Sequence, residues 1–285
     1  MTDKQYRRSY RKRHKAYEKA ALSFVRAAFE NQRKAVLSYL KKEGSGMFYL
    51  AIEVLISREE LKRAYSLIYA SVGMEEGRAE QAIFTSSAER RIKSGPISFS
   101  DADWRNYMVN YMLTYAGDRI DGINRKTKEK LRFLLAYAQE QGYTTDQTVN
   151  YLIQEIGSED FVEFSRSRAM AIARTEATTA ANVGTLKAGE SLSIQYEKRW
   201  ISTQDDRTRR IPEDKFDHFT MNGKTVAANE SFTVSGEQML HPGDPSKAVS
   251  RGNVINCRCV ARLVPVYDEQ GLPKPKTPVQ MFATV

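Results

Sequence analysis

The first 190 residues alternate hydrophobic and polar positions with the period of an α-helix. Apolar side chains recur every three or four residues from Tyr6 through Tyr10 and Tyr17, and Gly44-Ser45-Gly46 interrupts the pattern. The same periodicity predicts further helices, over approximately residues 47–69, 75–93, 101–140 with an interruption near Gly117 or Gly122, 145–156 and 158–189. Suitable N-cap residues begin three of these helices, namely Ser100, Thr144 or Thr145, and Ser158.

The pattern changes beyond residue 190, where short alternating runs replace the helical period. Strands are expected at residues 194–201, 224–227, 231–234 and 257–264. We therefore expect an α+β protein, in which an elongated all-helical N-terminal domain precedes a small β-rich C-terminal domain. The expected parts are a basic helical arm over 1–45, a helical domain over 46–190, a β-rich domain over 191–268 and an extended tail over 269–285.

Composition argues against a membrane-spanning helix and against secretion. The mean hydropathy is −0.55, and no apolar run approaches the roughly 18 residues that a spanning helix needs. The N-terminus lacks the apolar core of a secretory signal peptide, so we expect none. The two cysteines, Cys257 and Cys259, are too few for a disulfide scaffold and fit a reducing compartment.

Positive charge is concentrated at the N-terminus. Residues 1–42 contain 13 Lys and Arg against three Asp and Glu, which is a charge of +10, whereas the whole chain carries +9. The remaining residues therefore sum to −1. A cationic segment on a near-neutral body predicts a polyanionic partner for that segment.

The candidate DNA-binding residues are the cations of the segment 7–15, namely Arg7, Arg8, Arg11, Lys12, Arg13 and Lys15. Lys and Arg neutralise phosphates without reading sequence, and neighbouring tyrosines can stack on single-stranded bases. Around a helix these cations face most directions, which is not a base-reading pattern. Two other interpretations are a solvated terminus and a helix that meets an acidic protein surface. Deleting residues 1–15 is expected to weaken DNA retention and to leave the C-terminal domain folded.

The two cysteines are candidate metal ligands. They stand two positions apart in a predicted strand, so their side chains point to one face. As thiolates they are soft ligands for Zn²⁺, and His218 with Asp205 or Asp206 would complete the four ligands of a structural zinc site. A disulfide between them would close a very small ring with poor geometry.

Three alternatives to this zinc site remain open. His241 and Asp244 compete as ligands, and buried thiols also serve simply to pack a β-rich core. The alternative function is a metal-dependent hydrolase or toxin-like enzyme that uses His218, Cys257 and Cys259. The sequence contains no glycine-rich phosphate loop, HExxH or GxSxG motif, so we expect no enzyme.

A series of short motifs between residues 168 and 264 occurs in the order of a known family. They read AIARTE at 171–176 with AANVG at 180–184, KRW at 198–200, DDRTR at 205–209, His218 with Gly223 leading to Phe232, PGDP at 242–245 and VINCRC at 254–259. Together they resemble the Mu F-like minor head proteins of tailed bacteriophages, also called the phage head morphogenesis family. The resemblance covers roughly a third of the chain.

This resemblance implies a minor structural component of the capsid. The implied location is the virion, in the capsid interior or at the portal vertex, after synthesis in the bacterial host cytoplasm. The implied partners are the portal protein, the major capsid or scaffold protein and packaged double-stranded DNA, with no membrane in the mature head. The helical part would engage the portal or major capsid protein, and the basic N-terminus would contact DNA.

Two features depart from the family pattern. Residues 210–217 separate the DDRTR motif from His218, where the family has a shorter link, so we expect a local loop insertion. Some relatives carry a fused toxin or enzyme domain after the cysteine pair. This sequence ends soon after that pair, and we expect no such domain.

Overall fold

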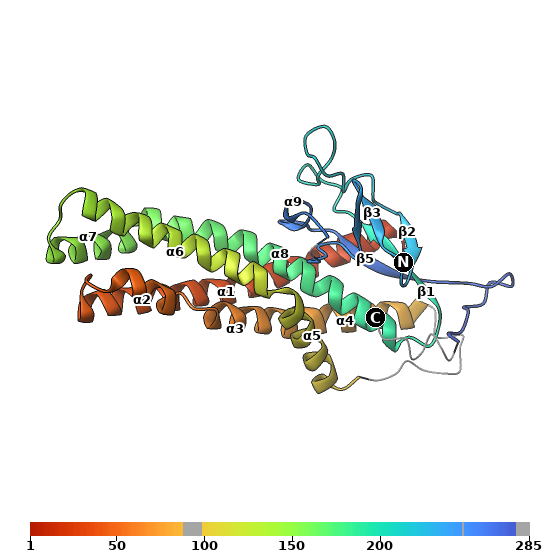
Figure 1. Cartoon of the computed structure of the whole chain (residues 1–285). Helices are drawn as coiled ribbons and strands as arrows, with labels where there is room; N and C mark the ends of the chain where they lie inside the picture. Colours follow the sequence, from red (N-terminus) through yellow and green to blue (C-terminus); the bar gives the residue numbers. More distant parts are fainter. Residues whose placement is uncertain (88–98, 247, 278–285) are drawn as a thin grey trace.

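A computed structural model describes residues 1–87, 99–246 and 248–277. Its helices form an elongated body, and the strands gather beside one end of that body (Figure 1). The α+β class is therefore confirmed, with a long helical N-terminal region and a small strand-containing C-terminal region. Among the described residues, no helix combines the length and the apolar character that crossing a membrane requires.

The helices occupy most of the first 191 residues. In chain order they are α1 (Asp3–Glu43), α2 (Phe48–Leu55), α3 (Glu59–Ile68), the π-helical turn η1 (Tyr69–Gly73), α4 (Met74–Ser87), α5 (Asp101–Tyr115), α6 (Gly117–Glu140), α7 (Thr145–Gly157) and α8 (Glu159–Ser191). Ser100, Thr144 and Ser158 cap α5, α7 and α8, and each side chain accepts the backbone N–H three residues on. The predicted caps are confirmed.

The described part of the chain beyond residue 191 contains five strands and a short helix. They are β1 (Tyr196–Ile201), β2 (Thr225–Ala227), β3 (Phe232–Val234), β4 (Glu237–Met239), α9 (Arg251–Val254) and β5 (Val260–Pro265). β1 is the centre of an antiparallel sheet in the order β2-β1-β5, and β3 and β4 form a separate hairpin. Trp200 of β1 lies opposite Ala261 of β5 and is fully buried, as expected of a core residue.

The expected N-terminal helix is confirmed, and it is part of the helical body rather than a projecting arm. A capping box at Thr2 begins α1, and Gly44, with a φ of 76°, ends it. Tyr6, Tyr10 and Tyr17 lie in the main core cluster, where α1 packs on α3 and α8. The apolar stripe of the basic segment therefore belongs to the core of the molecule.

One predicted helix is divided in the structure. Residues 47–69 form α2 and α3 with a break at 56–58. The Ser57 carbonyl at this break accepts hydrogen bonds from the side-chain amides of Gln32 and Asn124, at 3.3 and 2.8 Å. These amides come from α1 and α6 and satisfy a carbonyl that a continuous helix would use internally. Apolar spacing carries no information about such partners, so the prediction of one helix was wrong.

Two other helix predictions have different outcomes. α5 and α6 are separated at Ala116, which confirms the interruption expected near Gly117. The helix predicted over 75–93 is present as α4, and its last part, 88–93, lies outside the described residues.

Glycines allow α8 to cross η1 and α4 at backbone contact. A methyl group on Gly184 would lie 1.9 Å from the carbonyl oxygen of Gly73. One on Gly77 would lie 2.7 Å from the Gly184 carbonyl oxygen. Since both distances are far inside van der Waals contact, only glycine fits this crossing.

The cysteines precede a strand rather than lying within it. β5 begins at Val260, and Cys257 and Cys259 occupy the extended segment before it, so their predicted place in a strand was wrong. Asn256, with a φ of 59°, separates this segment from α9. The carbonyls of the segment bond to side chains of α8 instead of to a neighbouring strand, which is why no strand forms there.

The sequence patterns do not predict two further elements. β4 and α9 are short, and neither shows a periodic pattern long enough to predict. The β3–β4 hairpin turns through Ser235 and Gly236, whose φ angles of 49° and 86° are those of a tight two-residue turn. The tail contacts the helical body at the end of α8, where Lys276 Nζ donates to the Gly189 carbonyl at 2.8 Å. Residues 278–285 of the predicted tail lie outside the described residues.

Candidate functional site

Polar side chains on α8 hold the cysteine segment against the helical body. Thr178 Oγ1 donates to the Cys257 carbonyl at 2.5 Å. Asn182 donates to the Cys259 carbonyl at 3.1 Å and accepts from the Ala261 amide at 2.7 Å, as the backbone of a neighbouring strand would. The helix therefore fixes the backbone on both sides of the cysteine pair.

His218, Cys257 and Cys259 converge in the β-rich part, as the sequence predicts. The two sulfurs lie 3.6 and 3.7 Å from His218 Nδ1, and the three ligand atoms all lie within 4.8 Å of one another. Each of the three residues is 2% exposed, and both thiols are free. Asn253 Oδ1 lies 2.6 Å from the other ring nitrogen, Nε2, and orients the imidazole. We call these three residues the His–Cys cluster.

The members of the His–Cys cluster alter one another's protonation. Hydrogen bonding with Cys259 and the adjacent His218 hold the pKa of Cys257 well below its usual value, although burial opposes this. Burial raises the pKa of Cys259 well above its usual value. Burial lowers the pKa of His218, but Cys257 and Asn253 raise it by more. These contacts therefore favour the thiolate form of Cys257 over that of Cys259.

Asp205, the fourth predicted ligand, is not brought to this cluster. Its carboxylate accepts a bidentate pair from Arg258 at 2.7 and 2.8 Å and a further bond from Arg11 at 3.2 Å. Hydrogen bonding to Arg258 holds the pKa of Asp205 well below its usual range. Because successive side chains of an extended segment point to opposite sides, Arg258 points to Asp205 while Cys257 and Cys259 point to His218.

The competing ligands also lie apart from the cluster. His241 Nε2 lies 3.2 Å from the Tyr111 hydroxyl, and Asp244 accepts the Leu240 amide at 2.7 Å. Among the described residues, the groups that could hold a metal ion reduce to the three members of the His–Cys cluster.

The six predicted DNA-binding cations divide into two groups. Arg13 turns inward and donates to both carboxylate oxygens of buried Glu76, at 2.6 and 2.7 Å. Arg7 is half-buried and donates to Asn222 at 2.9 Å. The other four are exposed, namely Arg8, Arg11, Lys12 and Lys15.

These exposed cations belong to a longer row that we call the cationic face of α1. It consists of Lys4, Arg8, Arg11, Lys12, Lys15 and Lys19. At 3.6 residues per turn, the six lie within an arc of roughly 100° and along about 22 Å of the helix, opposite the buried tyrosines. Within the described residues Arg11 has an acidic partner, Asp205, and the other five have none. Helical spacing relative to Tyr6, Tyr10 and Tyr17 is the sequence signal that would have added Lys4 and Lys19.

The cationic face borders a groove between α1 and the loop that follows β1. The groove has a volume of about 280 Å³, and its walls include Tyr10, Lys15, Asp205 and Arg207. The Tyr10 hydroxyl is buried there without a hydrogen-bond partner among the described residues. Exposed Arg207 continues the positive charge from α1 onto the β-rich part.

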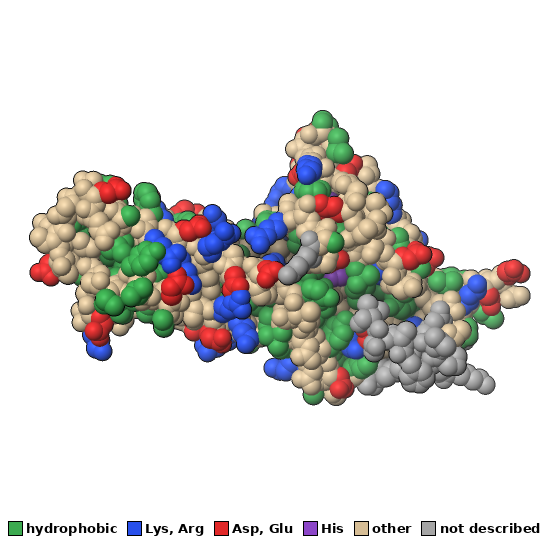
Figure 2. Space-filling model, viewed as in Figure 1, with side chains coloured by type: hydrophobic (Ala, Val, Ile, Leu, Met, Phe, Trp, Pro, Cys, Tyr) green, Lys and Arg blue, Asp and Glu red, His purple; other side chains and the backbone are tan. Residues whose placement is uncertain are grey.

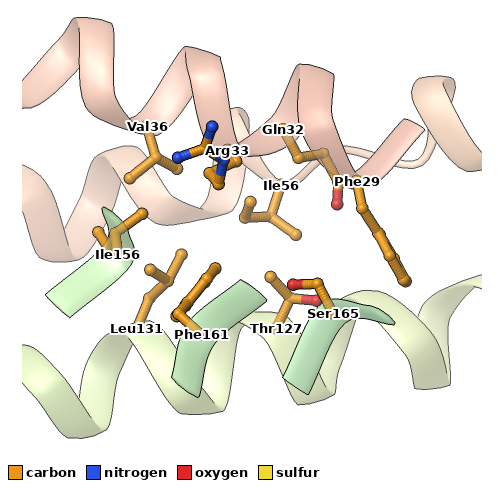
Figure 3. Close-up of a pocket in the computed structure, with 10 residues that line it drawn as sticks. All are labelled: Phe29, Gln32, Arg33, Val36, Ile56, Thr127, Leu131, Ile156, Phe161 and Ser165. Atoms are coloured by element: carbon orange, nitrogen blue, oxygen red, sulfur yellow. The ribbon is translucent and has the colours of Figure 1, made fainter. Parts of the chain in front are cut away.

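A smaller cavity lies inside the helical body (Figure 3). Its lining includes Phe29 and Val36 of α1, Leu131 of α6 and Phe161 of α8, and these apolar side chains face one another across it. The volume is about 10 Å³, which is room for roughly one water molecule. This cavity is a gap in packing rather than a ligand pocket.

Comparison with known families identifies the part of the chain from α6 to β5. The family described as "Phage Mu protein F like protein" matches residues 116–262. The chain belongs to this family. The match confirms the resemblance found in the sequence and identifies a phage head morphogenesis protein of the Mu F-like type. It extends from α6 into β5 and contains the whole His–Cys cluster, whereas α1–α5 precede it.

A curated relative shares a shorter region with this Mu F-like protein. The NAD(+)–arginine ADP-ribosyltransferase EFV of Enterococcus faecalis (strain ATCC 700802 / V583) is 36% identical over 100 residues. The aligned region covers 34% of this chain and 19% of the relative, so the chain spans about a fifth of the length of that relative. No solved structure matches the chain.

The Mu F-like protein exposes large hydrophobic side chains at the end of the body farthest from the strands. Tyr49, Leu50 and Val54 of α2 and Phe133 and Tyr137 of α6 are exposed there, Val54 by 77% and Phe133 by 62%. Figure 2 shows hydrophobic side chains gathered over α2 and α6 at this end. We call these five residues the apolar end. Exposed apolar groups that lie together mark surfaces where proteins interact.

Proposed function

We propose that this protein is a minor head component that attaches to the portal protein through its apolar end and lies against packaged double-stranded DNA through its cationic face. The observation that carries the DNA contact is the row of six exposed cations on α1, five of which have no acidic partner among the described residues. Family membership supports the placement in a phage head, which brings the protein close to packaged DNA.

The charge and length of the cationic face suit binding to the phosphate backbone of DNA. Duplex DNA carries one negative charge per ~1.7 Å of axis, so about 22 Å of helix surface faces several phosphates. Lys and Arg on one face of a packed helix bind by releasing counterions and do not read bases. Sequence-independent binding of this kind suits a protein that meets whatever part of a genome lies beside it.

Neutralising the cationic face is expected to weaken DNA binding strongly. We would replace Arg8, Lys12, Lys15 and Lys19 with alanine together, since all four are exposed and none supports the core. Each lost phosphate contact reduces the slope of log K against log salt by ~0.9, so the slope should fall by about 3 to 4. Binding of a random-sequence duplex across a salt series measures this change.

A matched control replaces one Arg and three Lys that are exposed elsewhere on the helical body, namely Lys41, Lys42, Lys62 and Arg125. This variant has the same net charge, and it should bind DNA almost as the unaltered protein does. Equal salt slopes for the two variants would contradict a localised DNA contact. Unchanged DNA binding with weakened portal binding would instead assign the face to an acidic protein surface.

The apolar end is the surface that we assign to the portal protein. It lies toward the opposite end of α1 from the cationic face, and α1 is about 60 Å long. One molecule can therefore bind the portal protein at one end and DNA at the other. Exposed Tyr49, Leu50 and Phe133 supply the aromatic and aliphatic anchors that carry most of the energy of protein interfaces.

Charged substitutions at the apolar end are expected to weaken portal attachment. In the double variant Val54→Asp and Phe133→Asp, two desolvated anchors become charges, and the affinity should fall by roughly tenfold or more. Co-purification with the portal protein of the same phage measures this loss. The control places Asp at Ile211 of the β-rich part and at Leu272 of the tail, which are 63% and 51% exposed. Retained attachment in the α2–α6 variant, or attachment to the major capsid protein instead, would contradict the proposed partner.

The enzyme alternative receives no support from the geometry of the site. His218, Cys257 and Cys259 are almost fully buried, and none of them lines either cavity described above. A catalytic nucleophile or metal needs an approach for substrate. We therefore assign the His–Cys cluster no part in turnover.

A further inference from the structure

We propose that His218, Cys257 and Cys259 bind one structural Zn²⁺ ion in the β-rich part. This site is separate from the cationic face and the apolar end, so it stands or falls independently of the portal and DNA contacts. Three residues of the types that zinc prefers converge there, from the loop before β2 and the segment before β5. They include every cysteine of the chain.

The spacing of the ligand atoms matches a zinc coordination sphere. With Zn–S near 2.3 Å and Zn–N near 2.0 Å, a tetrahedral angle places S and N about 3.5 Å apart. The observed distances from His218 Nδ1 to the two sulfurs are 3.6 and 3.7 Å. Both nitrogen–sulfur distances therefore fit one ion, and the two sulfurs lie within 4.8 Å of each other.

A second layer of contacts prepares His218 as a ligand. Asn253 Nδ2 donates to Glu237 at 2.9 Å, which fixes the orientation of the amide and directs Oδ1 to His218. Since Oδ1 only accepts, His218 Nε2 carries the hydrogen of their 2.6 Å bond. The lone pair of neutral His218 then lies on Nδ1, the atom that faces the sulfurs. A ligating histidine held in this way by its other nitrogen is the usual arrangement at protein zinc sites.

A buried hydrogen-bond donor belongs to the same core cluster as the two cysteines. The indole Nε1 of Trp200 is buried without a hydrogen-bond partner among the described residues. Metal-bound thiolates accept such bonds better than neutral thiols do, because they carry negative charge.

A bound ion would stabilise the β-rich part. β2, β3 and β4 have three residues each, and two small sheets of this kind bury little apolar surface by themselves. The ion would join the loop that carries His218 to the segment that α8 holds through Thr178 and Asn182. Among the described residues no fourth His, Cys, Asp or Glu joins the cluster, so the three side chains would supply three of the four ligands of a tetrahedral ion.

Metal analysis of the full-length protein tests the proposal. We expect close to one zinc per chain by elemental analysis after expression in zinc-containing medium. X-ray absorption at the zinc edge should show two sulfur ligands at ~2.3 Å and nitrogen at ~2.0 Å. Removal of the ion by a chelator should lower the melting temperature by about 10 °C, and Zn²⁺ should restore it.

Variants of the proposed ligands complete the test, and a buried histidine outside the cluster, His241, serves as the control. His218→Gln and the double variant Cys257→Ser with Cys259→Ser should lose at least nine-tenths of the zinc. His241→Gln, which alters an equally buried histidine outside the cluster, should retain it. If the ligand variants do not fold, the absorption spectrum of the unaltered protein still decides. Protein that stays free of zinc after reloading, zinc bound without sulfur ligands, or copper in its place would overturn the proposal.

Discussion

Replacing Gly184 with alanine is expected to destabilise the protein by about 3 kcal/mol or more. Overpacking a tightly packed core usually costs about 1–3 kcal/mol, and here the added methyl group meets backbone rather than a flexible side chain. It would lie 1.9 Å from the carbonyl oxygen and 3.0 Å from the Cα of Gly73. Relief requires α8 to separate from η1 and α4, which opens the main core cluster.

Denaturant unfolding measures this loss, and another helical glycine provides the control. Gly122 lies within α6, where a methyl group would meet only the Arg251 guanidinium at 3.4 Å. Gly122→Ala should therefore be neutral or stabilising by up to roughly 1 kcal/mol, because alanine favours helix. Equal unfolding midpoints for the two variants would show that the α8 crossing is not the close contact described here.

Deleting residues 1–15 is expected to unfold the protein rather than to remove a separable arm. The deletion takes Tyr6 and Tyr10 out of the core, where both are almost fully buried. Loss of one large buried aromatic side chain costs about 3–5 kcal/mol, whereas a whole domain is stable by about 5–15 kcal/mol. The structure thus changes the expectation, drawn from charge alone, that this segment can be deleted without affecting the fold.

Buried charge makes the same deletion more damaging. Glu76 is fully buried and is paired with Arg13 and with the Tyr17 hydroxyl. Removing one partner of a buried pair typically costs about 3–5 kcal/mol, since the other charge stays desolvated. Glu80 also loses the Tyr6 hydroxyl, and its pKa is already raised to about 7 by burial.

Circular dichroism and size-exclusion chromatography of the truncated protein check this expectation. The control is the variant with alanine at Arg8, Lys12, Lys15 and Lys19, which removes charge from the same helix and keeps every buried side chain. That variant should melt within a few degrees of the unaltered protein, because exposed substitutions usually change stability by less than ~0.5 kcal/mol. A truncated protein that melts cooperatively at the normal temperature would mean that α1 is dispensable to the core.

The sequence by itself determined most of the helices and the identity of the family. Helical periods, the caps at Ser100, Thr144 and Ser158, and the break at Gly44 depend on residues within about four positions of one another. The order of short motifs from AIARTE to VINCRC was enough to indicate the Mu F-like family. The zinc hypothesis drawn from the sequence named His218 and the cysteine pair, which the structure brings together.

Only the tertiary structure decided which polar groups are free to bind a partner. Arg13 and Arg8 look alike in the sequence, yet Arg13 pairs with Glu76 of α4, whereas Arg8 is exposed. The sequence made Asp205 a candidate metal ligand, whereas in the structure its carboxylate accepts hydrogen bonds from Arg258. These pairs join residues far apart in the chain, and a charge desolvated in a core needs its partner there. Local sequence patterns record the helix or strand, but not the distant group that a side chain meets.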